Sequence, residues 1–533
     1  MIFESSKIEV IISGQVVQHG FNHPVRNILL DSRKISHVTD ALFIAINGEH
    51  HDSHKYLSDV YAAGVRCFII EQDVDLIALP DANVIRVSSS IVALQQLATH
   101  HRKQFAFPTI GITGSNGKTI VKEWLNTMLA DDYHIVRSPK SWNSQIGVPL
   151  SVLNIESNHT LGIFEAGISQ PGEMERLAKV IQPTIGIFTS IGSAHSENFL
   201  SRRQLIGEKL NLFAPTEIII CPDDGELAQL ISAWSGSKQI VLVPQVERAT
   251  VGTHNNVTTV RLEWENSAFE FDIPFADRAS VENAVTCIHC LFVLKYDAEE
   301  IQSRLVRLTP LEMRLQLLDG DGDSVIVNDA YSNDLQSLEI ALDFLQQHAR
   351  GRTKIVILSD ILQSGLSEKD LHERINALLQ SKNISRLIGV GKSISNNTSS
   401  YQITSAFFDS TEHLLEKQSA AELNHCAVLV KGARDFRFER IVSLLQEKTH
   451  DTVLEINLNA LAHNLNYYRN KLKPETKVMV MVKAFGYGSG AHEVASLLEF
   501  NKVDYLAVAY TDEGVALRKA GVSLPIMVLN AEH

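Results

Sequence analysis

The chain has 533 residues, 44% of them hydrophobic and 21% charged, with a net charge of −14. This length and composition predict a globular protein of several domains, and the acidic balance argues against nonspecific binding to nucleic acid. No apolar run reaches the ~20 residues of a membrane span, and the N-terminus carries no basic and apolar signal segment. The five cysteines are scattered along the chain, which is typical of a reducing compartment, so we expect a cytoplasmic location.

Residues 1–106 alternate short β and α patterns, which predict a small α/β domain. The domain contains three short motifs, two of them polar and one mainly apolar: Asp31-Ser-Arg-Lys34, Asp52-Ser-His54 and Leu42-Phe-Ile-Ala-Ile-Asn-Gly48. Three histidines lie close together in the same region, at His50, His51 and His54. They could hold a metal ion, but a loop at the surface is the interpretation that we favour.

A glycine-rich loop opens the next segment, residues 107–307. The β-branched run Pro108–Thr113 predicts a strand, Ile120–Leu129 predicts a helix, and between them lies Gly114-Ser-Asn-Gly-Lys-Thr119. Glycines let backbone N–H groups approach phosphate oxygens, and a helix N-terminus adds positive potential. Lys118 would then reach the outer phosphates of a nucleotide, and the Thr119 hydroxyl would hold Mg²⁺. The first glycine of the strict phosphate-loop spacing is replaced by Ile112, so an ordinary turn is the alternative to the nucleotide site that we favour.

Further polar residues follow apolar runs in the same segment. Glu165 ends the run Leu161–Phe164, and His195 follows Thr189–Ala194. Lys209 stands beside Glu208, and spacing alone leaves open whether it is a solvated helix lysine or a site residue. Cys287-Ile-His-Cys290 lies within a helical apolar pattern and has no second cysteine pair, so we interpret it as helix core rather than a metal site.

A third α/β unit begins after Leu308-Thr-Pro310. We expect its strands at four short apolar runs: 324–328, 354–358, 387–390 and 427–430. Apolar runs that end in polar residues fit a doubly wound parallel sheet, because such sheets bind ligands at the carboxyl ends of their strands. The fold class is therefore α/β.

The pattern changes after residue 452. Lys483 and Tyr487 lie in the glycine-containing stretch Val478–Gly490, and we count three strands, at 477–482, 504–509 and 525–529. A closed β/α barrel has eight strands. Alone, Lys483 could be a charged residue that ends an ordinary strand.

The loop Thr113–Thr119 resembles that of the Mur ligases, which use ATP to join amino acids to UDP-linked muramic acid. Further motifs follow in the family's order up to about residue 447: Asn143-Ser-Gln-Ile-Gly-Val-Pro149, Glu165-Ala-Gly167, Lys209-Leu-Asn-Leu-Phe213 and Glu312-Met-Arg314. The chain departs from the family at Ala279 and Ser280, where His-Asn is common, and at Ser144, where a second asparagine is common.

The resemblance implies a set of site residues. Lys118, His195 and Lys209 would be catalytic, and Lys209 would be carbamylated. Magnesium would be held by Thr119, Glu165, His195 and carbamylated Lys209. ATP would be bound by Gly114, Ser115, Asn116, Gly117, Lys118, Thr119, Asn283, Arg314 and Asp329.

Within the family, three motifs resemble the branch that adds D-alanyl-D-alanine to UDP-MurNAc-tripeptide: Asn328-Asp-Ala-Tyr-Ser-Asn333, Ser359-Asp-Ile-Leu-Gln-Ser-Gly365 and Val430-Lys-Gly-Ala-Arg434. The Asp-Asn-Pro-Arg motif of the branch that adds the third residue does not occur in the sequence. On the acceptor side the resemblance implies Asn328, Tyr331, Asn333, Lys431 and Arg434, and on the UDP side Ser32 and Arg33. The partners would be ATP, UDP-MurNAc-tripeptide and D-Ala-D-Ala.

Residues 454–465, 478–490 and 506–518 resemble the start of alanine racemase, a pyridoxal-phosphate (PLP) enzyme on a β/α barrel. Lys483 matches its Schiff-base lysine, and Tyr487 matches a tyrosine near the cofactor phosphate. With three of the barrel's strands, we expect a truncated and inactive racemase. The ligase part would be a monomer, whereas racemases of this family are dimers.

These resemblances divide the chain into a UDP-substrate domain (1–106), a central ATP-binding domain (107–307), a Rossmann-like ligase domain (308–447), a linker (448–452) and a racemase fragment (453–533). They predict an ATP-dependent amide ligase of peptidoglycan precursor synthesis. Two alternatives stay open: another Mur-type or folylpolyglutamate-type ligase, and a non-catalytic scaffold that binds nucleotide.

Overall fold

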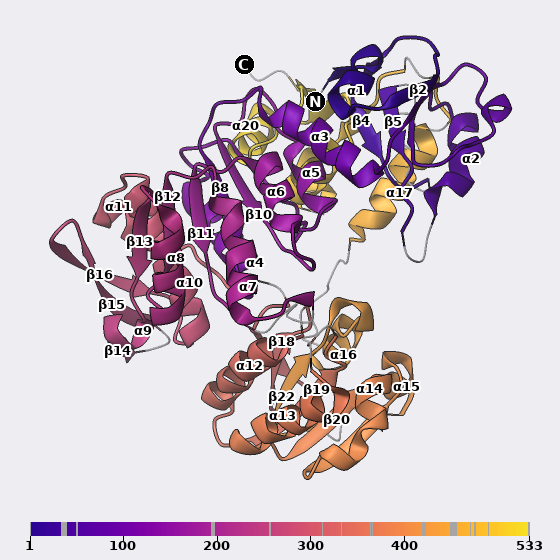
Figure 1. The fold of residues 1–533 in the computed structure, drawn as a ribbon. Coiled ribbons are helices and arrows are strands. Elements are labelled where there is room, and N and C mark those ends of the chain that lie inside the picture. Colours follow the sequence, from indigo (N-terminus) through magenta and orange to yellow (C-terminus); the bar gives the residue numbers. More distant parts are fainter. Residues whose placement is uncertain are drawn as a thin grey trace. The chain divides into compact units, whose positions relative to one another are not determined.

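The computed structural model (Figure 1) describes residues 2–32, 40–48, 52–192, 198–254, 257–311, 313–331, 333–362, 364, 366–417, 423–447, 456–469, 471–473, 476–488 and 490–530. The chain forms two compact units, one made of residues 1–100 and 450–533 and the other of residues 101–449. Within the described ranges, no helix is both long and apolar enough to cross a membrane.

The N-terminal part of the first unit is built on a five-stranded sheet. Its strands, in spatial order, are β2 (Gln15–Gln18), β7 (Asn83–Arg86), β6 (Cys67–Ile70), β5 (Ala41–Ile44) and β4 (Asn27–Leu29). Only β2 runs antiparallel to its neighbour in this sheet. The β-branched and aromatic side chains of β5, β6 and β7 are buried, and Phe43 and Phe68 meet edge to face. The helices are α1 (Ser5–Ile12), α2 (Leu57–Ala62) and α3 (Ser90–Arg102).

The C-terminal part of the same unit contains the three strands expected from the sequence. They are β23 (Met479–Met481), β24 (Tyr505–Val508) and β25 (Ile526–Val528), paired in parallel. One sheet face packs against α17 (Leu458–Arg469), α19 (Ala491–Phe500) and α20 (Thr511–Lys519). The other face carries Met479, Met481 and Met527, which are 44%, 37% and 46% exposed. Among the described residues, this second face of the sheet is therefore partly exposed.

The second unit begins with a six-stranded, wholly parallel sheet. Its spatial order is β13 (Gln239–Val243), β12 (Ile218–Pro222), β11 (Ile185–Phe188), β8 (Thr109–Thr113), β10 (Leu161–Glu165) and β9 (Ile135–Arg137). The strand order reverses around β8, and in open α/β sheets ligands bind at such a reversal, outside the carboxyl ends of the strands.

Helices cover both faces of this sheet, as a parallel sheet requires. On one face, α4 (Lys118–Leu129) and α10 (Arg278–Val293) share a core with β8, and a small antiparallel sheet joins them: β14 (Thr250–His254), β15 (Val257–Trp264) and β16 (Ser267–Ile273). Cys287 and Cys290 lie in this core as buried thiols, which confirms their interpretation as helix core. On the other face, Phe213 packs where Gly186 of β11 leaves room for its ring.

A second six-stranded sheet follows. Its order is β17 (Gln316–Gly320), β18 (Ser324–Asp329), β22 (Cys426–Lys431), β19 (Thr353–Ser359), β20 (Arg386–Val390) and β21 (Thr404–Phe408), and only β17 is antiparallel. One face packs against α12 (Leu335–His348) and α13 (Glu368–Ser381), and the other against α15 (Thr411–Lys417) and α16 (Glu439–Leu445). The four strands expected from the sequence are confirmed as β18, β19, β20 and β22.

Candidate active site

The glycine-rich loop joins the carboxyl end of β8 to the first turn of α4. Gly114 and Gly117 have φ angles of +145° and +85°, which side chains rarely allow. A Cβ at Gly114 would lie 2.2 Å from Thr189 Oγ1, and one at Gly117 would lie 2.4 Å from Asn283 Oδ1. Both positions therefore require glycine, for conformation and for space.

The end of β11 holds this loop in place. Ser115 N donates to Ser190 O at 2.8 Å, and Asn116 N donates to Ser190 Oγ at 3.0 Å. Gly192 N in turn donates to Ser115 Oγ at 2.8 Å. Because these hydrogen bonds tie the loop to the residues after a neighbouring strand, the loop is pre-organised to receive an anion at the N-terminus of α4.

Two lysines share one carbonyl oxygen at this loop. Lys118 Nζ donates to Gly114 O and to Ser115 O, both at 2.8 Å, and Lys209 Nζ donates to Gly114 O at 3.1 Å. Burial lowers the pKa of Lys118 to about 8. Burial, and then the nearby Lys118 charge, lower the pKa of Lys209 well below its ordinary value. The pair forms a cationic site that an anion would stabilise.

Lys209 is not the solvated helix lysine that its spacing left open. It lies in the last turn of α7 (Arg202–Leu210), and only 2% of it is exposed. The helix starts at Ser201, whose side chain accepts from Gln204 N, and its length brings Lys209 to the loop after β8. That alternative is wrong, because the lysine is directed inward at the glycine loop.

An acidic side chain lies beside the lysines, at the end of β10. Glu165 is fully buried, and its Oε2 accepts a hydrogen bond from Thr119 Oγ1 at 2.9 Å. Its Oε1 has no hydrogen-bond partner. A buried carboxylate with one oxygen that accepts no hydrogen bond, next to a hydroxyl, suits a hard cation such as Mg²⁺, so the residues fit the predicted metal. His195 lies outside the described residues, and within those residues no group of three His, Cys, Asp or Glu side chains forms a metal cluster.

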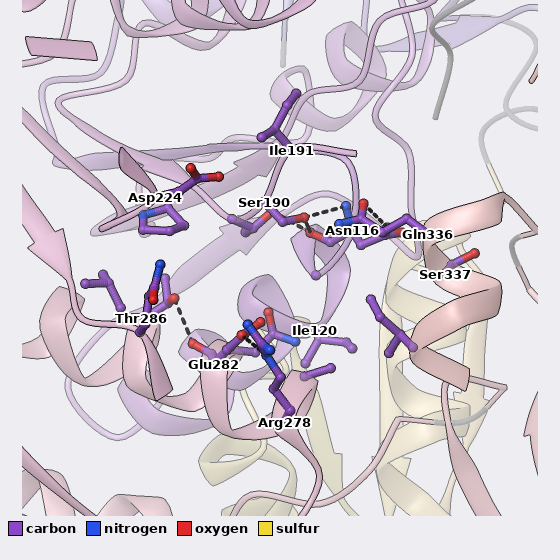
Figure 2. Close-up of a pocket in the computed structure, with 18 of the residues that line it drawn as sticks. Asn116, Ile120, Ser190, Ile191, Asp224, Arg278, Glu282, Thr286, Gln336 and Ser337 are labelled. Atoms are coloured by element: carbon purple, nitrogen blue, oxygen red, sulfur yellow. Dashed lines mark hydrogen bonds and ion pairs between the residues drawn. The ribbon is translucent and has the colours of Figure 1, made fainter. Parts of the chain in front are cut away.

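A cavity of about 270 Å³ extends from the glycine loop (Figure 2). Figure 2 shows Asn116, Ser190 and Gln336 together at one end, with Arg278, Glu282 and Thr286 of α10 lining another part of its wall. The predicted residues Asn283, Arg314 and Asp329 all line the cavity. The sequence did not indicate several further lining residues, among them Asp224, Gln245, Arg278 and Glu282.

Side chains from the α/β part that contains the second six-stranded sheet also reach the loop. Gln336 Oε1 accepts from Asn116 Nδ2 at 3.1 Å, and Arg314 Nη2 donates to Thr119 Oγ1 at 3.3 Å. The Arg314 guanidinium lies 4.5 Å from the centre of the Tyr331 ring. Residues from both α/β parts of this unit therefore converge on the carboxyl end of β8.

The predicted acceptor-side residues lie around β18 and β22, and most are engaged with one another or with neighbours. Lys431 is fully buried and its Nζ lies 2.6 Å from Asp329 Oδ2, so it supports Asp329 from within the sheet. Asn328 Nδ2 donates to Gln316 Oε1 at 3.1 Å, and Asn333 Nδ2 donates to Ser359 O at 2.9 Å. The Oδ1 atoms of both asparagines lack partners, and buried amide oxygens of this kind can accept from a ligand. Arg434 lies 5.8 Å from the Tyr331 ring centre.

In the N-terminal part, Ser32 is half-buried and Arg33 lies outside the described residues. His54 is 7% exposed, its Nδ1 lies 2.7 Å from Asp52 Oδ1, and its Nε2 accepts from Glu71 N at 3.0 Å. The surface-loop interpretation of His54 is therefore wrong: the side chain is a buried hydrogen-bonding group. His50 and His51 lie outside the described residues.

Lys483 begins a short helical turn, α18 (Lys483–Tyr487), whose residues Ala484, Phe485 and Gly486 have left-handed backbone angles. Glu513 holds the turn, because its Oε1 accepts from Ala484 N at 2.6 Å and its Oε2 accepts from Ala509 N at 2.7 Å. Tyr487 is 60% exposed. A lysine at a strand end, a glycine-containing turn and a nearby phenol fit the anchor and phosphate side of PLP.

Two stretches match known families: residues 112–291 match the Mur ligase middle domain, and residues 456–533 match the alanine racemase N-terminal domain. The middle of the chain is therefore a Mur ligase domain. The chain joins a Mur ligase to the N-terminal part of an alanine racemase. The UDP-N-acetylmuramoyl-tripeptide–D-alanyl-D-alanine ligase of Bacillus subtilis is 28% identical over 381 residues, which make up 69% of this chain and 80% of that protein.

Solved Mur ligases share the fold. MurF from Acinetobacter baumannii superposes with a TM-score of 0.71 at 22% identity, covering 83% of this chain and 98% of its own. MurF from Thermotoga maritima in complex with ADP superposes with a TM-score of 0.66 at 20% identity, covering 79% of this chain and 97% of its own. The Mur-type α/β fold with its parallel central sheet is therefore confirmed, and the three-stranded parallel sheet belongs to the racemase barrel part.

Proposed function

We propose that this chain is an ATP-dependent amide ligase that adds D-Ala-D-Ala to UDP-MurNAc-tripeptide in peptidoglycan precursor synthesis. One observation carries the proposal: Lys118 and Lys209 share the carbonyl of Gly114 near the buried Glu165 carboxylate, whose Oε1 accepts no hydrogen bond. Cations beside a site for Mg²⁺ are what phosphoryl transfer requires. The substrates are those named for the Bacillus subtilis relative.

The reaction needs activation, because a carboxylate does not form an amide with an amine unaided. The γ-phosphoryl group of ATP moves to the terminal carboxylate oxygen of the tripeptide, and ADP leaves. The amine of D-Ala-D-Ala then attacks the acyl carbon, phosphate leaves, and the nitrogen loses a proton. Lys118 neutralises charge that develops on the phosphoryl oxygens. Bound Mg²⁺ would add further charge neutralisation, held by Thr119 and Glu165, with His195 and Lys209 at a second ion.

Lys209 is proposed to be carbamylated. Only a neutral amine reacts with CO₂, and its lowered pKa keeps a larger share of the amine neutral. The carbamate would be an oxygen-donor anion facing Lys118, which turns a repulsive pair of cations into an attractive pair and suits Mg²⁺.

We propose that the three ligase domains bind ATP, the acceptor and the UDP moiety. ATP would occupy the cavity along the Gly114–Thr119 loop, with Asn283, Arg314 and Asp329 in contact with it. Tyr331, Asn328 and Asn333 would face the acceptor, supported by Lys431 and Arg434. Ser32 and Arg33 would contact the UDP moiety. The bond from Arg314 to Thr119 supports a site completed by both α/β parts.

For residues 453–533 we propose that Lys483 would anchor PLP, with Tyr487 near its phosphate, and that this segment does not racemise alanine as it stands. PLP supplies an electron sink when bound. Racemisation also needs proton exchange on both faces of the substrate, hence two positioned groups. The chain should be incubated with PLP and assayed for conversion of L- to D-alanine. Conversion that Lys483→Ala abolishes would contradict this part of the proposal.

The deciding experiment for the ligase measures ADP release by the full chain. We expect release that requires both UDP-MurNAc-tripeptide and D-Ala-D-Ala, tested with lysine and with diaminopimelate as the third residue. Release with a folate and glutamate would favour the folylpolyglutamate-type alternative. No release with any acceptor, although nucleotide binds, would favour the scaffold and overturn the proposal.

A further inference from the structure

Lys122 is a fully buried lysine in the ligase unit for which the sequence gave no role. It lies one helical turn after Lys118 in α4, and its side chain has an exposed fraction of 0%. An ammonium group in the protein interior is strongly unfavourable unless charges and hydrogen bonds compensate it. The partners of Lys122 therefore indicate what it does.

Four oxygen atoms surround this ammonium. Lys122 Nζ donates to Ser138 O at 2.7 Å and also to Lys140 O. It lies 2.9 Å from Glu123 Oε1 and 3.6 Å from Glu165 Oε1, the oxygen that has no hydrogen-bond partner. The cation thus joins two backbone carbonyls of one turn to the carboxylate proposed to bind Mg²⁺.

The turn at residues 138–143 is held in an unusual shape. Lys140 has a φ of +50°, which is uncommon for a residue with a side chain and is found where surrounding contacts enforce it. Its carbonyl is one of the two that accept from Lys122. Ser138 Oγ also accepts from Glu165 N at 3.3 Å, so the turn and the end of β10 are linked twice.

The same turn also contacts Tyr331, which follows β18, and Gly167, which follows β10. Ser141 Oγ and Tyr331 OH form a hydrogen bond, and the Tyr331 ring lies against the Arg314 guanidinium. Asn143 O accepts from Gly167 N at 2.8 Å. A change in the position of the turn would therefore move Tyr331 and Asn143 together.

We propose that Lys122 is a positioning residue of the ligase site. Its ammonium fixes the Glu165 carboxylate and the 138–143 turn relative to each other, and through Ser141 it places Tyr331. It also weakens the attraction of Glu165 for Mg²⁺, because a cation lies beside the metal-facing oxygen. The inference rests on the proposed ligase function and adds a residue to it.

The test compares Lys122→Met with the wild-type full chain. We expect kcat for ADP release to fall on the order of 10²-fold, because displacement of site groups by about 1 Å costs that much, while the KM for ATP stays nearly constant. In the ADP-bound protein without acceptor, Mg²⁺ should bind several-fold tighter to the variant, since the competing cation is gone. Loss of folding alone would not produce tighter metal binding together with a slower reaction.

Two further variants keep the test decisive. Lys122→Met combined with Glu123→Gln removes one anion along with the cation, which compensates the buried charge if the single variant unfolds. Ser141→Ala should slow ADP release by itself yet add little to Lys122→Met, because both act through the same turn. Lys179→Met is the matched control, since Lys179 is 67% exposed and forms an ion pair with Glu175 on the helix surface; its kcat should be unchanged.

The outcomes separate this inference from the proposed function. A wild-type chain that releases no ADP with any acceptor overturns both. An active wild type whose Lys122 variants keep full kcat, or whose Mg²⁺ affinity is unchanged or weaker, overturns the role of Lys122 alone. Additive effects of Lys122→Met and Ser141→Ala would overturn the connection through the turn.

Discussion

Two parallel strands in this molecule end in a lysine-containing turn, and their surroundings differ. The loop after β8 exchanges hydrogen bonds with the residues that follow β11 and with Gln336 of α12, and helices cover both faces of its own sheet. The turn after β23 is held by Glu513, and one face of its sheet exposes three methionines.

The difference indicates how much of each site is already built. At the ligase loop, backbone and side-chain partners fix the geometry before any ligand arrives, which is the pre-organisation that electrostatic catalysis needs. At Lys483 the turn is held by Glu513, and the nearby Tyr487 side chain is 60% exposed. We therefore expect changes at the first site to affect chemistry and changes at the second to affect local stability.

The largest effect should come from Lys118→Ala. Removing the ammonium leaves the transferring phosphoryl group without one of its neutralising charges, and we expect turnover to fall about 10³-fold or more. The measurement is ADP release with both substrates at saturation. Near-normal turnover would contradict the assignment of the loop and would remove the contrast with Lys483.

Lys209→Ala should have the next largest effect, a loss of turnover on the order of 10²-fold. Short carboxylic acids should restore part of the activity, because they replace the missing carbamate oxygens. Bicarbonate should stimulate the wild-type enzyme at mildly acid pH, where less of the amine is neutral. A fully active Lys209→Ala variant, or one that carboxylates do not rescue, would count against carbamylation.

Leu506→Ala should destabilise the racemase part and leave the ligase part unaffected. Leu506 is a fully buried residue of β24, and its truncation should destabilise the racemase part by about 3 kcal/mol through the cavity that it leaves. Hydrogen exchange of residues 479–528 should accelerate while ADP release stays unchanged. The matched change Ile187→Ala in β11 should instead lower ligase activity and stability. Loss of ligation in Leu506→Ala would show that the two parts are coupled.

The smallest expected effect is a proton taken up when nucleotide binds. Lys118 has a pKa of about 8 in the folded protein against an ordinary 10.5, so between these values the unfolded chain holds more protons and stability rises with pH. Nucleotide phosphates beside the lysine should raise its pKa again. Calorimetric titration near pH 8.5 in buffers of different ionisation enthalpy should detect an uptake of less than one proton, and Lys118→Met should reduce it.

The sequence predicted what depends on local pattern. The strand, glycine loop and helix around Lys118 are encoded in consecutive residues, and so are the strands of the second sheet and of the racemase part. Glu165 was found for the same reason, because it ends an apolar run at the carboxyl edge where parallel strands collect ligands.

Other features depend on distant neighbours and could not be read from the sequence. Lys122 was missed because a lysine within a helical pattern is usually solvated, and its partners Ser138 and Lys140 lie 16 and 18 residues away. The bond between Asn116 and Gln336 spans 220 residues. His54 was misassigned because its second partner, the backbone N–H of Glu71, lies 17 residues away. For Lys122, the sequence offered one signal of burial, namely its place next to apolar residues such as Val121 and Leu125.

The spacing of functional side chains along helix α4 limits where the chain can accept insertions or deletions. Lys118 and Thr119 are the residues proposed to meet phosphate and metal, Lys122 donates to the carbonyls of a turn, and Trp124 Nε1 donates to Thr309 O at 2.9 Å. Each added residue rotates everything beyond it by about 100° around the helix axis. An insertion or deletion within these seven residues would therefore misdirect at least one of these groups, so the segment 118–124 should tolerate substitutions at some positions but no change in spacing.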